Sequence, residues 1–205
     1  MRRTILIVSF ISATFVCWGQ SQYLEPVKDF KEYEGDLKAY YDSVFPLLYK
    51  GFSEKPTARF TSMPSFSSEY SFSIETIDGK SYVVSNSLSE SYWYAKNKKN
   101  VKVISNKAEL IRDLYLKVVD LFALLAEQTK TPANDLMRLD GVTYYFATTG
   151  KDGQIKIGET WSPGDKSLLG RLIKICNKLY SVGKRNKISQ TDLLNEVDKL
   201  LKDLQ

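Results

Sequence analysis

The side chains in this sequence that are best suited to catalysis are carboxylates. Two carboxyl groups that face each other across a cleft, about 5 to 10 Å apart, can hydrolyse a glycosidic bond. Seven acidic residues lie on or beside predicted strands: Glu69, Glu75, Glu90, Asp140, Asp152, Glu159 and Asp165. Turn formation explains Asp140 and Asp152 better, because each precedes a glycine. The sequence indicates no pairing among the seven, so we assign no catalytic residue and keep a carboxylate-dependent hydrolase, such as a glycosidase, as an alternative function.

The composition excludes most other catalytic and metal-binding chemistry. The chain has no histidine and only two cysteines, whereas the usual zinc sites and the Ser-His-Asp or Cys-His catalytic sets need these residues. The glycine-rich motifs that bind nucleotide phosphates, G-x-x-x-x-G-K-[ST] and G-x-G-x-x-G, are also absent. We therefore expect no metal site and no cofactor.

Four aromatic residues are the candidate binding residues. Tyr92, Trp93 and Tyr94 are consecutive, so on a strand Trp93 must face away from its two neighbours. At least one large ring would then point toward solvent or toward a second layer of the fold. Trp161, at the end of a predicted hairpin, could lie beside them. Exposed aromatic rings stack on sugars or anchor partner proteins, although burial of all four rings in the core is the alternative.

The positive charge of the chain is modest. It carries 29 basic and 24 acidic residues, a net charge of +5, and aromatic residues do not alternate with Lys and Arg as they do in RNA-binding proteins. We therefore expect no nucleic-acid partner. Lys96, Lys98 and Lys99 follow the aromatic cluster and could attract an anionic partner, but three lysines in a turn also protect a sheet edge from pairing.

The first 19 residues have the pattern of a signal peptide. Residues 1–3 include two arginines, residues 5–16 are mainly apolar, and Gly19 is a small residue at the expected cleavage position. The apolar run is shorter than the ~20 residues that span a bilayer. We therefore expect export, without a transmembrane span after processing, of a mature chain that begins at Gln20. It would reside in the periplasm, at the cell surface or in the medium. Lipid anchoring at Cys17 is an alternative, although the preceding valine departs from the lipoprotein motif.

Removal of the signal peptide would leave Cys176 as the sole cysteine. No intramolecular disulfide could then form, even in an oxidising compartment. Cys176 lies at helical spacing between Ile173 and Tyr180, which favours a buried, unreactive thiol over a nucleophile.

The elements that must position these residues begin with a hairpin. Residues 70–76 alternate between apolar and polar side chains, which is typical of a strand with one buried face. The pair Asp78-Gly79 suits a two-residue turn in which both positions have positive φ. The resulting register places Ile74 opposite Val83.

The remaining periodicities predict further strands and four helices. Strands are expected at residues 58–62, 80–84, 88–95, 101–104, 142–147 and 154–161. Helices are expected at residues 27–48, 106–128, 162–183 and 189–204. The order of hairpin, long helix, hairpin and helix suggests duplicated halves. We predict a single α+β domain over residues 20–205, with five to seven mostly antiparallel strands and the helices mainly on one face of the sheet.

The signal peptide, the missing catalytic residues and the aromatic cluster together indicate a function, although no motif of a known family can be carried over. We expect an exported bacterial protein of the cell envelope that acts as a non-catalytic binding or interaction module, through the strand face around Trp93. Its partner could be a glycan, a cell-wall fragment or a protein. A proteinaceous inhibitor of a secreted enzyme is a further alternative beside the hydrolase.

Overall fold

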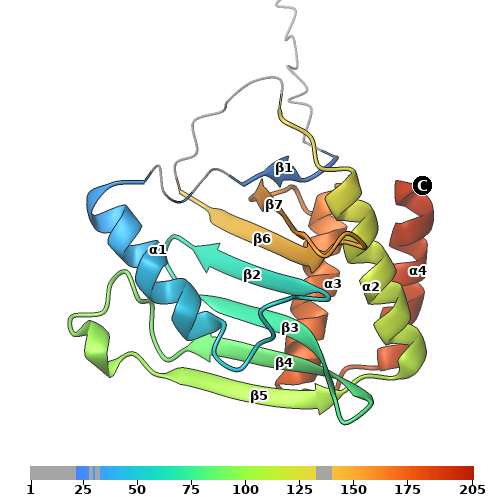
Figure 1. The fold of residues 1–205 in the computed structure, drawn as a ribbon, viewed down its shortest axis with the longest axis horizontal. Helices are drawn as coiled ribbons and strands as arrows, with labels where there is room; N and C mark the ends of the chain where they lie inside the picture. The colour runs from blue at the N-terminus through green and yellow to red at the C-terminus, as the bar shows by residue number, and fades with distance from the viewer. Residues whose placement is uncertain (1–21, 28–29, 31–32, 133–139) are drawn as a thin grey trace, which may run out of the picture.

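The computed structural model describes residues 22–27, 30, 33–132 and 140–205. The predicted signal peptide and its cysteine lie outside this part of the chain. The described residues form one seven-stranded antiparallel sheet and four α-helices (Figure 1). The predicted α+β class with an antiparallel sheet built from hairpins is confirmed. Within the described ranges, no helix combines the length and the apolar character that crossing a membrane requires.

The sheet is built from hairpins whose order in space differs from their order in the chain. Across the sheet the strands follow the order β1-β7-β6-β2-β3-β4-β5, and every neighbouring pair is antiparallel. The bounds are β1 Glu25–Pro26, β2 Arg59–Pro64, β3 Tyr70–Ile77, β4 Lys80–Leu88, β5 Val103–Glu109, β6 Val142–Thr149 and β7 Ile155–Trp161. The central strand β2 therefore joins the hairpin β3–β4 to the hairpin β6–β7.

The predicted turn and register of the hairpin β3–β4 are confirmed. Asp78 and Gly79 have φ values of 51° and 76°, as the two-residue turn requires. Ile74 lies opposite Val83. Because side chains alternate between the faces of a strand, this register places both residues on the same face, and both are buried in the main core.

The predicted strand at residues 88–95 is wrong. β4 ends at Leu88, and the chain then turns through residues 91–94. The carboxyl group of Glu69 accepts a hydrogen bond of 3.0 Å from the backbone N–H of Tyr92. This N–H is therefore not available to a neighbouring strand, and the aromatic residues that follow lie on a loop.

The predicted start of the second helix at residue 106 is also wrong. β5 continues through Asn106 to Glu109, and the helix α2 Arg112–Glu127 begins after it. Asn106 pairs with Ser85 and Glu109 with Tyr82 on β4. Pairing with the neighbouring strand outweighs the local sequence signal for a helix cap at this point.

The helices cover the two faces of the sheet unequally (Figure 1). The helix α1 Gly35–Leu48 crosses one face, and α2, α3 Leu168–Gly183 and α4 Gln190–Leu204 lie on the other. α4 packs against α2 and α3. The prediction that the helices gather mainly on one face is confirmed, although α1 starts at Gly35 and not at residue 27.

The face of the sheet toward α2 and α3 is apolar. Phe60, Phe72 and Phe146 come from neighbouring strands and are at most 3% exposed. Phe122 of α2 packs against the last two, with ring centroids 6.3 and 5.8 Å apart. Cys176 of α3 is fully buried in the same core, and burial raises the pKa of its thiol. The prediction of a buried cysteine is confirmed.

The face toward α1 is mixed: polar side chains lie beside a second, smaller apolar cluster that includes Val44, Met63 and Tyr145. Thr61, Ser71 and Asn86 point to this side and are at most 1% exposed. The hydroxyl oxygens of Thr61 and Ser71 are 3.0 Å apart. Asn86 Nδ2 donates hydrogen bonds of 2.8 and 2.9 Å to the carbonyl oxygens of Leu48 and Lys50, at the C-terminal end of α1. α1 is therefore attached to the sheet partly through directional hydrogen bonds.

Candidate functional site

Three exposed aromatic side chains gather at the end of the sheet where β2 and β4 end. Phe66 follows β2, and Trp93 and Tyr94 follow β4; their exposed fractions are 69%, 44% and 57%. The rings of Phe66 and Tyr94 are nearly parallel, with an interplanar angle of 17° and centroids 6.4 Å apart. Trp93 meets the ring of Tyr40 edge-on, with centroids 5.2 Å apart. We call Phe66, Trp93 and Tyr94 the exposed aromatic patch.

A buried carboxyl group holds the loop that carries Trp93 and Tyr94. Glu69, directly before β3, is fully buried. Its Oε1 accepts a hydrogen bond of 2.6 Å from the hydroxyl of Tyr40 on α1, and its Oε2 accepts one of 3.0 Å from the backbone N–H of Tyr92. A buried carboxyl group is costly unless it is hydrogen-bonded, so these bonds fix the loop relative to α1.

A lysine binds the same loop from the solvent side. The ammonium group of Lys98 donates to the carbonyl oxygens of Tyr92 and Trp93, at 2.6 Å for the latter. It also lies 5.2 Å from the centroid of the Tyr92 ring. Lys96 and Lys99 are exposed beside it. The exposed aromatic patch therefore has three ammonium groups in its neighbourhood, of which one holds the loop.

The structure divides the four predicted binding residues. Trp93 and Tyr94 belong to the exposed aromatic patch, whereas Tyr92 is half-buried and contributes its backbone to the loop. Trp161 is half-buried at the end of β7, and β6, β2 and β3 lie between that strand and β4. Four strand spacings amount to roughly 19 Å, so the structure does not bring Trp161 to the other three.

Phe66 is the patch residue that the sequence did not indicate. It lies in a loop rich in serine, outside any periodic segment. The available signal for its exposure was that it is a single large apolar residue in a polar loop. Such a residue has no strand or helix face on which to be buried. Its neighbour Tyr94 lies 28 positions later in the sequence, and the pairing of β2, β3 and β4 brings the two together.

Two of the seven candidate acids, Glu69 and Glu159, are buried. They lie on the β3 and β7 sides of the sheet with β6 and β2 between, so roughly 14 Å of strand spacing separates them. This exceeds the separation that a glycosidase pair needs. Glu25 of β1 lies directly opposite Glu159, but Glu159 is only 4% exposed, which limits access of a substrate to its carboxyl group.

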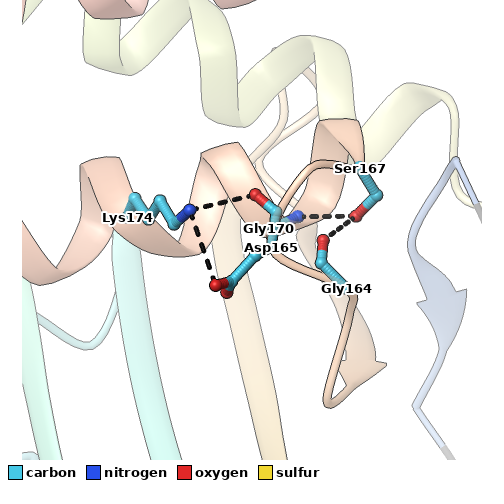
Figure 2. Close-up of polar contacts among 5 residues, drawn as sticks. All are labelled: Gly164, Asp165, Ser167, Gly170 and Lys174. Atoms are coloured by element: carbon cyan, nitrogen blue, oxygen red, sulfur yellow. Dashed lines mark hydrogen bonds and ion pairs between the residues drawn. The ribbon is translucent and has the colours of Figure 1, made fainter.

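Asp165 belongs to the start of α3 (Figure 2). Ser167 Oγ accepts a hydrogen bond of 2.9 Å from the backbone N–H of Gly170 and donates one of 2.7 Å to the carbonyl oxygen of Gly164. Lys174 Nζ lies 3.1 Å from the carbonyl oxygen of Asp165 and 3.8 Å from its carboxylate. These contacts give Asp165 a role in the structure of the helix start.

The other candidate acids have local structural roles or are exposed at the surface. Glu75 Oε1 accepts a hydrogen bond of 3.1 Å from the backbone N–H of Ser53, and Asp152 Oδ1 accepts one of 3.0 Å from that of Gln154 within a turn. Glu90 and Asp140 are exposed, as are the bends that carry them. In the ranges that the structure describes, no three acidic or cysteine side chains come together in a group that could hold a metal ion.

Three largely buried tyrosines make the stability of the protein sensitive to high pH. Burial raises the pKa of Tyr70 to about 12, from an ordinary value near 10. Burial also raises the pKa of Tyr145, and burial followed by the hydrogen bond to Glu69 raises that of Tyr40. Each hydroxyl holds its proton more tightly in the folded chain than in the unfolded chain, so its contribution to stability is complete below about pH 10 and is lost as the pH rises further.

We therefore expect the free energy of unfolding to fall from about pH 10 upward, by up to about 1.4 kcal/mol per pH unit for each of these tyrosines. Urea titrations followed by circular dichroism at successive pH values measure this slope. The variant Tyr70→Phe lacks one of the three hydroxyls and should show a shallower slope. A free energy of unfolding that stays constant up to about pH 12 would contradict the expectation.

Comparison with known proteins assigns this chain to no family. No protein-family model, no curated protein and no solved structure matches it. Function therefore has to be inferred from the geometry of the described residues.

Proposed function

We propose that this protein is a non-catalytic binding module that binds a glycan through the exposed aromatic patch. The observation that supports this most is the near-parallel pair of rings of Phe66 and Tyr94, each more than half exposed, with the exposed Trp93 on the same loop as Tyr94. The apolar faces of sugar rings stack on aromatic rings, and an exposed aromatic group of this kind marks an interaction surface.

Hydrogen bonds within the protein hold the loop of the patch. Glu69 and Lys98 bond to its backbone, and the hydroxyl of Tyr40 donates to the carboxylate of Glu69. Ordering a flexible loop on binding would cost conformational free energy. The bonds to Glu69 and Lys98 reduce this cost, which favours a role for the loop in recognition.

The surroundings of the patch favour an anionic glycan of the cell envelope. Lys96 and Lys99 are exposed next to the loop, and positive charge attracts anionic partners and accelerates their association. The predicted signal peptide, with residence in the periplasm, at the cell surface or in the medium, would place the protein among wall fragments and other envelope glycans. A protein partner, including a secreted enzyme that the chain would inhibit, is the competing possibility.

Isothermal titration of the protein with acidic and neutral glycans and with wall fragments tests the proposal. We expect at least one of them to bind, and we expect Tyr94→Ala and Phe66→Ala each to weaken binding by about tenfold, as removal of a principal contact residue does. Both substitutions leave Trp93 in place, so its fluorescence can report binding in parallel.

Tyr82→Ala is the matched control for Tyr94→Ala, because Tyr82 is also a partly exposed tyrosine but lies near the start of β4, at the opposite end of that strand from the patch. It should leave the dissociation constant unchanged within about twofold. Absence of binding to every glycan, together with capture of a single secreted protein whose affinity depends on Tyr94, would contradict glycan binding and support a protein partner. Equal losses in Tyr82→Ala and Tyr94→Ala would contradict the placement of the site.

A further inference from the structure

A concave site, separate from the exposed aromatic patch, lies between α1 and the half of the sheet formed by β2, β6 and β7. It is a pocket of about 180 Å³. Aromatic rings from α1, from the segment before it and from β6 form most of its wall, and one charged residue and exposed isoleucines of β7 complete it. The residues that define it are Phe30, Phe45, Tyr49, Arg59, Tyr145 and Ile157. None of them belongs to the exposed aromatic patch.

Arg59 is the charged residue of the pocket, and it is 8% exposed. Its Nη2 donates a hydrogen bond to the carbonyl oxygen of Ser53, and its guanidinium carbon lies 4.5 Å from the centroid of Tyr49 and 5.4 Å from that of Phe52. Its Nε is buried and has no hydrogen-bond partner among the described residues. The carboxylate of Glu75 acts on the charge of Arg59, but the two side chains form no ion pair within 4.0 Å.

A buried guanidinium group without an anion is costly, because arginine keeps its charge at all ordinary pH values. The stacking of Arg59 on two aromatic rings compensates part of this cost. The pocket therefore offers a positive charge in a largely apolar setting.

The mouth of the pocket is apolar. Ile155 and Ile157 of β7 line it and are 47% and 45% exposed. The described pairing of β1 with β7 is at Gly158 and Glu159, so it does not include the two isoleucines. A ligand whose apolar part lay against them would remove this surface from water, which is favourable.

We infer that this pocket binds a small monocarboxylate with an apolar body, either one aromatic ring or a chain of about six to eight carbons. The carboxylate would pair with Arg59, and the apolar body would contact Phe45, Tyr145 and Ile157. Cavities of roughly 150 Å³ lined by apolar side chains hold a benzene ring, so the volume fits a ligand of this size. A planar guanidinium group matches the geometry of a carboxylate, and Arg59 is the one charged residue in the described lining of the pocket, which favours a ligand with a single negative charge.

Nuclear magnetic resonance of the full chain with labelled isoleucine methyl groups tests this inference. Phenylacetate and octanoate serve as probes, and phenylacetamide serves as the uncharged control of the same shape. We expect both carboxylates to shift the methyl signals of Ile155 and Ile157, and we expect phenylacetate to bind at least about tenfold more tightly than phenylacetamide, which is typical of a hydrogen bond to a charged group.

Two variants separate the charged contact from the apolar one. Arg59→Gln should weaken phenylacetate to the affinity of phenylacetamide and leave phenylacetamide itself unchanged. Ile157→Ser changes an exposed side chain, so the fold should tolerate it, and it should weaken both probes by about threefold to tenfold through lost apolar contact. Failure of every carboxylate to shift the two methyl signals, or a preference for phenylacetate that survives in Arg59→Gln, would overturn the inference. Neither result bears on the exposed aromatic patch.

Discussion

Replacement of Phe60 by alanine is expected to lower the free energy of unfolding by about 3 to 5 kcal/mol. Phe60 lies on the central strand β2 and is fully buried. Its ring is 5.6 Å from Phe72, 5.7 Å from Tyr144 and 5.3 Å from Phe146, measured between centroids. Removing it leaves a cavity at the point where the two hairpins meet, and the neighbouring rings cannot fill this space without leaving their own contacts.

Urea denaturation followed by circular dichroism measures this loss. Phe66→Ala is the matched control, because Phe66 is the same residue type but is 69% exposed. Its effect should stay within about 0.5 kcal/mol. Similar losses in the two variants would show that the ring of Phe60 is not at the centre of the core.

Gly170→Ala is expected to destabilise the protein by about 3 kcal/mol, in the range of overpacked core positions. Gly170 lies in the first turn of α3, next to the cap formed by Ser167 (Figure 2). A Cβ atom on Gly170 would lie 2.1 Å from the carbonyl oxygen of Gly164, which is backbone. The helix start or the preceding loop would have to move, and the hydrogen bonds of Ser167 would be disturbed.

The sign of this effect is informative, because alanine in a helix is otherwise more favourable than glycine by about 1 kcal/mol. Stabilisation by Gly170→Ala, measured as a rise in the urea midpoint, would contradict the close approach of the two backbone segments. Lys174→Ala on the same helix is the control. It removes only exposed contacts to Asp165 and should change stability by less than about 0.5 kcal/mol.

The sequence was sufficient to predict the fold where local signals and tertiary contacts agree. Alternation of side chains and the pair Asp78-Gly79 defined both strands of the first hairpin and its register. The stripes of apolar residues predicted α3 and α4, and Ser167 and Ser189 cap these helices. Local signal and tertiary contacts disagree at Asn106 and Glu109. Their spacing is typical of a helix cap, but both residues pair with β4.

The candidate site was predictable only in part. The run of residues 92–94 indicated, on a predicted strand, that at least one large ring would point toward solvent or toward a second layer. The strand does not form, and Trp93 and Tyr94 are exposed on a loop. The turn that presents them depends on the buried carboxyl group of Glu69, and no local pattern identifies which glutamate will be buried. Phe66 and Arg59 each gain their neighbours from strands distant in sequence, so their roles follow from the order of the strands.

The helices on the two faces of the sheet should differ in the free energy needed to separate them from it, because the two faces bury different amounts of apolar surface. Separation of α3 from the sheet would expose phenylalanine rings to water, which is unfavourable in proportion to their area. Displacement of α1 would expose a smaller apolar cluster, together with groups such as Thr61 and Asn86, which water can hydrate in place of their present partners. Low-energy opening motions should therefore involve α1 more than α3. Because Phe45 of α1 lines the pocket that contains Arg59, movement of α1 would open this pocket to solutes.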